Sequence, residues 1–193
     1  MPATTREITA QDVIPVAEFA EQRRERRAAL LPIKRLRRID VGPYCTFYFE
    51  SFETMLFQIQ EMLLIEKGGE AQLADELAAY NPLIPKGREL VATVMFEVDE
   101  PVRRAKFLGN LGGVERHFYL QLDDQRIDGA PEEEDERTRD DGKTSAVHFI
   151  RFQFTDEQAA AFRAPATKAM IGCNDPRYAH IAVLSPAAKA ELA

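Results

Sequence analysis

One helix-forming segment constrains the fold of this chain more than any other feature. Residues 52–67, FETMLFQIQEMLLIEK, place apolar side chains at helical spacing on two opposite sides. One side carries Met55, Leu56, Ile59, Met62 and Leu63, and the other carries Phe57 and Leu64. Because a helix that is apolar on two sides has to be covered on both, the sequence predicts a buried helix here.

Polar side chains lie between the two apolar sides of this helix, at Thr54, Gln58 and Glu61. A buried carboxylate without a partner is costly, so Glu61 requires one. Two interpretations stay open. Either Glu61 pairs with an arginine, such as one from the basic residues 21–38, or Glu61 and Gln58 line a pocket or hold a metal ion.

The rest of the chain alternates between helical and extended patterns. Thr9 and Asp12 form a T-x-x-D start signal, which predicts a long N-terminal helix over about 10–31, ended by Pro32. Aromatic and branched residues predict strands at 45–49, 89–98, 114–122, 146–154, 166–172 and 178–184. Because hairpin-like connections are mixed with short helices, we expect an α+β fold with a mostly antiparallel sheet, and a mixed sheet stays open.

Length and composition favour one domain covering residues 1–193, since the chain is 45% hydrophobic and 30% charged. No apolar run approaches the roughly 20 residues that span a bilayer, so we expect no membrane contact. The opening residues MPATTREITAQDV do not resemble a secretory signal. Cys45 and Cys173 are widely separated in sequence, which is typical of free thiols in a reducing cytoplasm. We therefore expect a cytoplasmic location.

Charge is distributed very unevenly along the chain. Residues 123–141 contain ten acids and three bases, and residues 21–38 contain eight bases and two acids. The acidic stretch has glycine and proline but few apolar residues, which predicts a mobile surface loop at about 124–143. The basic stretch reads as a helix exterior that pairs with acids in the protein or on a partner. The pI of 5.1 and the absence of aromatic residues among these bases disfavour nucleic acid.

The three histidines, His117, His148 and His180, all lie in predicted strands. Together, or with Glu61, they would supply nitrogen and oxygen ligands for a transition metal such as iron or zinc. Strand alternation argues against convergence, because His148 falls on an apolar face and His117 on a polar one. The alternative is that each is an ordinary core or surface histidine.

Several motifs resemble a bacterial family known only as a domain of unknown function. The most specific is RRIDVGPYCTFYFESFETMLFQIQEML at 37–63, and the others are YNPLIP at 80–85, ELVATVMFEV at 89–98, SAVHFIRFQFT at 145–155 and NDPRYAHIAVLSP at 174–186. The resemblance covers nearly the whole chain and implies no catalytic residues. The binding candidates within its motifs are Arg38, Glu50, Gln58, Glu61 and Tyr178.

The resemblance also implies a cellular setting. Genes of this family often lie beside those of a rubrerythrin-like protein and an iron–sulfur oxidoreductase, which implies a link to cytoplasmic redox or peroxide metabolism. The first hypothesis is therefore an accessory or binding protein that contacts such a partner. The alternative is a metal-binding protein or metal-dependent enzyme that uses Glu50, Glu61 and histidine ligands. The sequence does not decide whether the protein is an enzyme.

Overall fold

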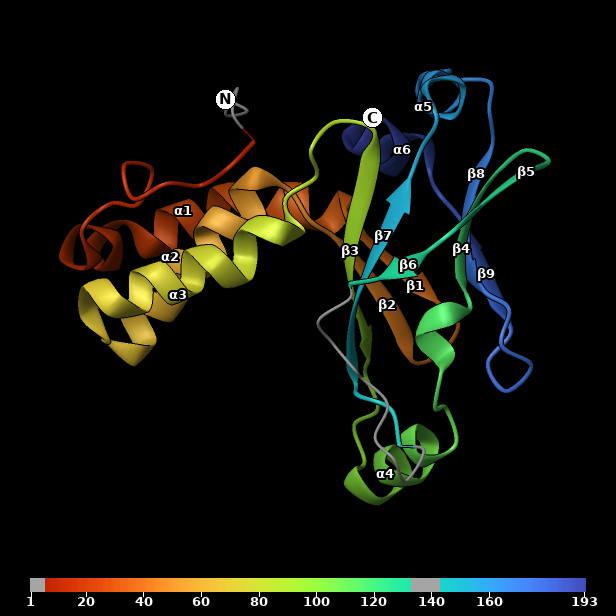
Figure 1. Ribbon diagram of the computed structural model, residues 1–193, viewed down its shortest axis with the longest axis horizontal. Helices are drawn as coiled ribbons and strands as arrows, with labels where there is room; N and C mark the ends of the chain where they lie inside the picture. Colours follow the sequence, from red (N-terminus) through yellow and green to blue (C-terminus); the bar gives the residue numbers. More distant parts are fainter. Residues whose placement is uncertain (1–5, 133–142) are drawn as a thin grey trace. The chain divides into compact units, whose positions relative to one another are not determined.

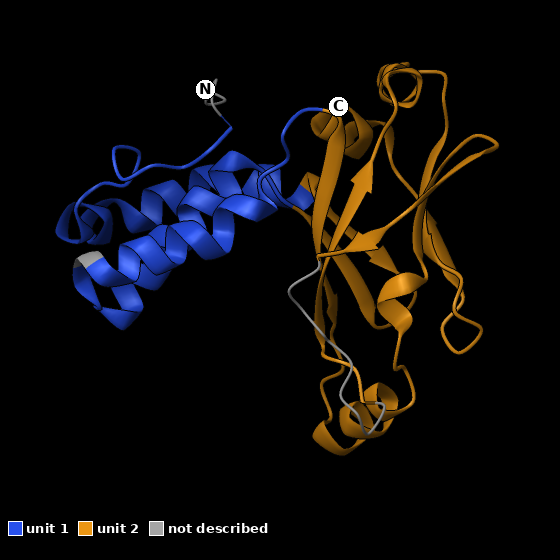
Figure 2. Ribbon diagram, in the orientation of Figure 1, with its two compact units in different colours: residues 1–35, 50–87 blue, residues 36–49, 88–193 orange. Residues whose placement is uncertain are grey.

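The computed structural model describes residues 6–132 and 143–193, except for the side chain of Glu70. The chain forms two compact units (Figure 2). The helical unit comprises residues 1–35 and 50–87, and the sheet unit comprises residues 36–49 and 88–193. That residues 1–193 form a single domain stays a prediction.

Three helices build the helical unit: α1 (Val16–Leu36, whose last residue belongs to the sheet unit), α2 (Phe52–Glu66) and α3 (Gly69–Tyr80) (Figure 1). A short 3₁₀ turn, η1 (Asn81–Leu83), follows α3. Residues 6–15 precede α1 without helix or strand structure, and we call them the N-terminal strap. Among the described residues, no helix has both the length and the apolarity needed to cross a membrane.

Two antiparallel sheets build the sheet unit. The first has the order β1-β2-β3-β7-β6, with β1 (Arg38–Val41), β2 (Cys45–Phe49), β3 (Glu89–Phe96), β7 (Val147–Gln153) and β6 (Ala130–Pro131). The second has the order β5-β4-β8-β9, with β5 (Gln125–Asp128), β4 (Phe118–Leu122), β8 (Ala169–Cys173) and β9 (His180–Val183). The remaining elements are α4 (Pro101–Gly109), η2 (Val114–Arg116), α5 (Asp156–Arg163) and α6 (Pro186–Leu192). The predicted α+β class with a mostly antiparallel sheet is confirmed.

The core of the sheet unit lies between the two sheets. Phe47 of β2 meets Phe118 of β4 edge to face, with ring centroids 5.3 Å apart. Phe96 of β3, which pairs with β2, and Phe152 of β7, which pairs with β3, are also buried. Alternation along each strand directs one set of side chains into this core and the other set outward.

Helix α2 begins at the predicted residue, Phe52, and ends one residue before the predicted end. Ser51 accepts a hydrogen bond from the Thr54 amide and the Thr54 hydroxyl accepts one from the Ser51 amide, which completes a capping box. The helix ends where Lys67 adopts the left-handed conformation, with φ of 57°. Buried side chains such as Met55, Ile59 and Leu63 cover one side of it.

The N-terminal helix lies further along the chain than expected. Thr9 and Asp12 form an isolated turn, in which Asp12 Oδ2 accepts hydrogen bonds from the amide and hydroxyl of Thr9. The helix begins at Val16 and runs through Pro32 to Leu36. Pro32 is exposed, so solvent can hydrate the carbonyl oxygen that loses its amide donor.

The expected acidic loop at 124–143 is also partly wrong. Its first part forms β5 and β6, because Ile127 alternates with polar neighbours, pairs with Leu120 and is buried. Asp123, with φ of 47°, makes the two-residue turn that joins β4 to β5. Residues 133–142 lie outside the described residues, so mobility there stays a prediction.

Replacing Ile127 by alanine tests this correction. Because Ile127 fills the core, we expect Ile127→Ala to lower the free energy of unfolding by about 2–4 kcal/mol in a urea titration. The matched control is Ile181→Ala in β9, where the side chain is 49% exposed and the loss should stay below about 0.5 kcal/mol. Equal losses in the two variants would contradict the correction and favour a surface loop at residues 124–128.

Candidate functional site

Glu61 of α2 forms a two-point ion pair with Arg23 of α1. Arg23 Nε donates to Glu61 Oε1 and Arg23 Nη2 donates to Glu61 Oε2, both at 2.7 Å. The hydrogen bonds from Arg23 lower the pKa of Glu61; burial opposes this shift, and the charges of Arg27 and Lys34 add to it. The interpretation that Glu61 pairs with an arginine of the basic segment is therefore confirmed.

Apart from Arg26, which lies on another side, the cations of α1 gather on one side of the helix. At about 100° per residue they span an arc of about 120°, and we call them the basic stripe: Arg23, Arg24, Arg27, Lys34 and Arg35. Leu31 lies within the same arc and is 45% exposed. The helix's own acids, Glu18, Glu21 and Glu25, fall on a different arc, and within α1 Arg24 alone of the stripe has an acid three or four residues away, Glu21.

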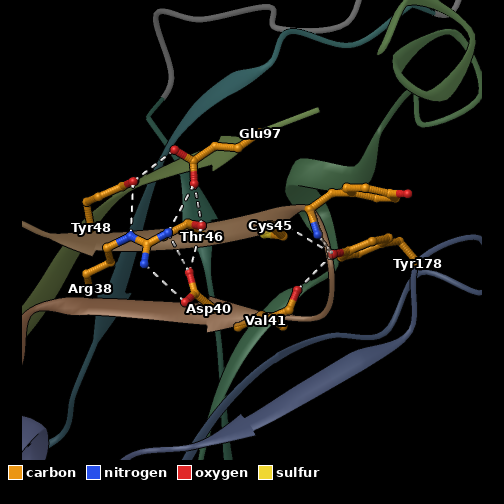
Figure 3. A network of polar contacts seen from close by, with 9 residues as sticks. Arg38, Asp40, Val41, Cys45, Thr46, Tyr48, Glu97 and Tyr178 are labelled. Carbon is orange, nitrogen blue, oxygen red and sulfur yellow. Dashed lines mark hydrogen bonds and ion pairs between the residues drawn. The ribbon is translucent and has the colours of Figure 1, made fainter. Parts of the chain in front are cut away.

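Arg38 belongs to a polar network on the outer face of the first sheet (Figure 3). Its guanidinium lies 3.0 Å from Asp40 and 3.6 Å from Glu97 and donates to the hydroxyl of Tyr48 at 3.3 Å. The Thr46 hydroxyl donates to Glu97 at 2.6 Å. Burial favours a higher pKa for Glu97, but the hydrogen bonds from Thr46 and Tyr48 and the charge of Arg38 outweigh it and leave that pKa lowered. The network thus satisfies Arg38 internally, and a binding role for Arg38 stays a prediction.

Tyr178 fixes the turn between β1 and β2. Its hydroxyl accepts from the amides of Tyr44 at 2.9 Å and Cys45 at 3.0 Å and donates to the carbonyl of Val41 at 2.8 Å. Gly42 passes so close that a Cβ atom there would lie 2.8 Å from this hydroxyl. Burial raises the pKa of Tyr178 to about 12, so the hydroxyl stays protonated near neutral pH. Its place is structural, and ligand binding by Tyr178 stays a prediction.

Glu50 directly precedes the cap of α2, whereas Gln58 lies in the middle of the helix and also hydrogen-bonds the side chain of Tyr80. Glu50 Oε2 accepts from the Thr54 hydroxyl at 2.6 Å, which extends the capping box. Gln58 Nε2 lies 3.3 Å from the sulfur of Met62, one turn further on. None of these contacts requires a ligand, and binding by these two residues stays a prediction.

Two side-chain amides to which the sequence assigned no role hold the N-terminal strap. Gln60 of α2 accepts from the Ile14 amide at 3.0 Å and donates to the Ile14 carbonyl at 3.2 Å. Asn81 likewise accepts from the Ile8 amide at 2.8 Å and donates to the Ile8 carbonyl at 2.9 Å. Each amide therefore replaces a strand partner for one residue of the strap. Gln60 lies within the resembling motif at 37–63 and Asn81 within the one at 80–85, which is the feature of the sequence that pointed to them.

The histidines occupy three different environments of the sheet unit. His148 is fully buried in the core, where its Nε2 lies 2.9 Å from the Ser145 carbonyl oxygen. His117 is half-buried, and its Nε2 lies 3.8 Å from a carboxylate oxygen of Asp175. His180 packs beside the ring of Tyr178, with centroids 4.5 Å apart.

The predicted metal set is not assembled. Within residues 6–132 and 143–193, no three or more His, Cys, Asp or Glu side chains are grouped to hold a metal ion. His117, His148, His180 and Glu61 form no such group among these residues, and metal binding by any of them stays a prediction. The reason that they form no such group is strand alternation, which directs His148 into an aromatic core, while Arg23 already occupies both oxygens of Glu61.

The two cysteines are free, buried thiols of the sheet unit. Burial raises the pKa of Cys173 to about 11 and that of Cys45 well above its ordinary value. A negative charge on Cys173 would also raise the pKa of Cys45, so the two side chains lie close enough to interact despite their separation in sequence. Because the thiolate is the reactive form, both are unreactive near neutral pH.

Removal of the Tyr178 hydroxyl should be costly. Tyr178→Phe leaves two backbone amides and one carbonyl without their partner, so we expect a loss of about 2–4 kcal/mol in a urea titration. The control is Tyr48→Phe, whose hydroxyl lies at the protein surface, with a loss below about 1 kcal/mol. A similar loss in both variants would mean that Tyr178 does not hold the turn.

Removal of the Glu61 charge should also destabilise the fold, but less, because Arg23 is 41% exposed. We expect Glu61→Gln to lower the melting temperature by about 2–4 °C. Asp75→Asn makes the same charge change at an exposed position of α3 and should shift it by less than about 1 °C. An unchanged melting temperature for Glu61→Gln would show that the pair is dispensable.

Comparisons with known proteins agree with the described geometry. The family model "Protein of unknown function (DUF3501)" matches residues 7–193. A search of curated proteins found no match. A crystal structure of a protein of unknown function from Burkholderia pseudomallei K96243 is 34% identical, covers 96% of each chain and superposes with a TM-score of 0.89. The chain therefore belongs to the DUF3501 family of proteins of unknown function.

Proposed function

We propose that this protein is a binding protein that docks an acidic surface of a partner protein through the basic stripe of α1. The observation that carries the proposal is the sorting of charge around α1. Five cations share one arc. Three of them, Arg23, Arg27 and Lys34, lower the pKa of the same carboxylate, Glu61. The stripe therefore keeps a local excess of positive charge.

This local excess supports docking although the whole protein carries a net charge of −7. The screening length at physiological salt is about 8 Å, so a partner close to α1 responds to the stripe more than to distant acids. Oppositely charged patches orient two proteins during encounter and raise the association rate.

Two details favour a protein partner. The Glu61 carboxylate fixes the guanidinium of Arg23 at two points, which reduces the side-chain entropy lost on binding. The exposed Leu31 supplies apolar contact area between the cations. A cationic rim around an exposed apolar residue suits a protein surface of matching acidic and apolar groups.

The proposed partner is the iron–sulfur oxidoreductase or the rubrerythrin-like protein that the family resemblance implies. Encounters between redox proteins use small interfaces and depend on charge, which suits a single helix stripe. The protein would then act as an accessory factor of redox or peroxide metabolism in the cytoplasm. The buried free thiols suit such a reducing setting.

Charge reversal within the stripe tests the proposal. The purified rubrerythrin-like protein and the purified iron–sulfur oxidoreductase are each titrated by calorimetry, at about 50 mM and about 500 mM NaCl. We expect one of them to bind at low salt and to lose most of its affinity at high salt. The double variant Arg24→Glu/Arg27→Glu should weaken binding at low salt by about tenfold or more.

The matched control is Lys106→Glu/Lys168→Glu, which changes the net charge equally at exposed positions of the sheet unit. It should change the affinity less than about twofold, because neither residue belongs to the basic stripe. Equal weakening by both double variants would show that net charge alone governs binding. Failure of either partner to bind the parent protein would overturn the proposed partnership.

A further inference from the structure

The helical unit contains an apolar hollow that the proposed docking surface does not use. Its volume is about 510 Å³. It lies where the N-terminal strap and the start of α1 meet the corner between α2 and α3. Its main lining side chains are Val13, Ile14, Val16, Leu63, Leu73 and Lys67.

The walls of this hollow are fixed by hydrogen bonds. Gln60 holds Ile14 on one side through both backbone groups of that residue. On the other side, Gln72 accepts from the Gly68 amide at 2.6 Å and donates to the Met62 carbonyl at 3.2 Å, which holds the α2–α3 corner. A hollow with fixed walls loses little entropy on binding a ligand.

Among its described lining residues, Lys67 alone carries a charge. Lys67 has φ of 57°, a left-handed conformation that glycine adopts without penalty and lysine does not. The helix end does favour a cation here, through the helix dipole. Lys67 is thus an exposed cationic residue that lines an otherwise uncharged, mainly aliphatic hollow, which is the pattern that suits an apolar chain ending in an anion.

We propose that this hollow binds a free medium-chain fatty acid. The alkyl chain contacts Val13, Leu63 and Leu73, and the carboxylate pairs with Nζ of Lys67. The volume lies within the range of about 300–1,000 Å³ that is typical of small-molecule sites, which are mainly apolar with few polar groups. This inference does not depend on the proposed docking function.

Titration with decanoate below its micelle concentration, followed by methyl NMR, tests the inference. We expect saturable shifts of the Val13, Leu63 and Leu73 methyl signals and no shift at Ile181 in the sheet unit. Decanol has the same chain without the charge and should bind at least about tenfold more weakly, because it cannot pair with Lys67. Absence of saturable shifts, or equal affinity for decanol, would overturn the proposal.

Two substitutions of Lys67 separate a ligand role from a structural one. Lys67→Gly relieves the left-handed backbone and should melt no lower than the parent, so that a loss of binding cannot result from unfolding. Lys67→Gln removes only the charge. Both should weaken decanoate binding by about tenfold or more, whereas Lys106→Gln, on exposed α4, should leave it unchanged. Parent-like affinity in both Lys67 variants would overturn the proposal.

Discussion

The polar side chains of the covered helix α2 determine how the helical unit is built. Each of them has to find a hydrogen-bond partner, because burial without one is costly. Thr54 is satisfied within the cap of its own helix, Gln60 by the backbone of Ile14, and Glu61 by the guanidinium of Arg23. Through these contacts α2 fixes its own start, the N-terminal strap and α1.

This constraint also determines which surfaces remain for binding. Since Arg23 is held against α2, the flank of α1 that carries Arg24, Arg27 and Leu31 is left exposed. The strap, held by Gln60, forms one wall of the apolar hollow. The sheet unit uses the same principle differently, since the Tyr178 hydroxyl satisfies three backbone groups of one turn.

Local patterns in the sequence predicted the fold class and α2, and they limited Glu61 to two roles. The pattern could not choose between these roles, because the partner lies 38 residues away in the chain. Pro32 misled the placement of α1, since a proline is tolerated where solvent replaces the lost hydrogen bond. Strand alternation correctly placed His148 in the core, but His117 precedes β4, the strand expected at 114–122, and lies outside it. The contacts of Gln60 depend on tertiary packing that periodicity does not encode.

Native-state hydrogen exchange at the Ile14 amide tests most directly whether α2 holds the strap. Ile14 lies outside any helix or strand, so its amide is protected only if the bond to Gln60 persists. The account predicts exchange that is slowed by at least about tenfold relative to an unstructured peptide, with the protection lost in Gln60→Leu. Exchange of the Ile14 amide at the rate of an unstructured peptide would contradict it.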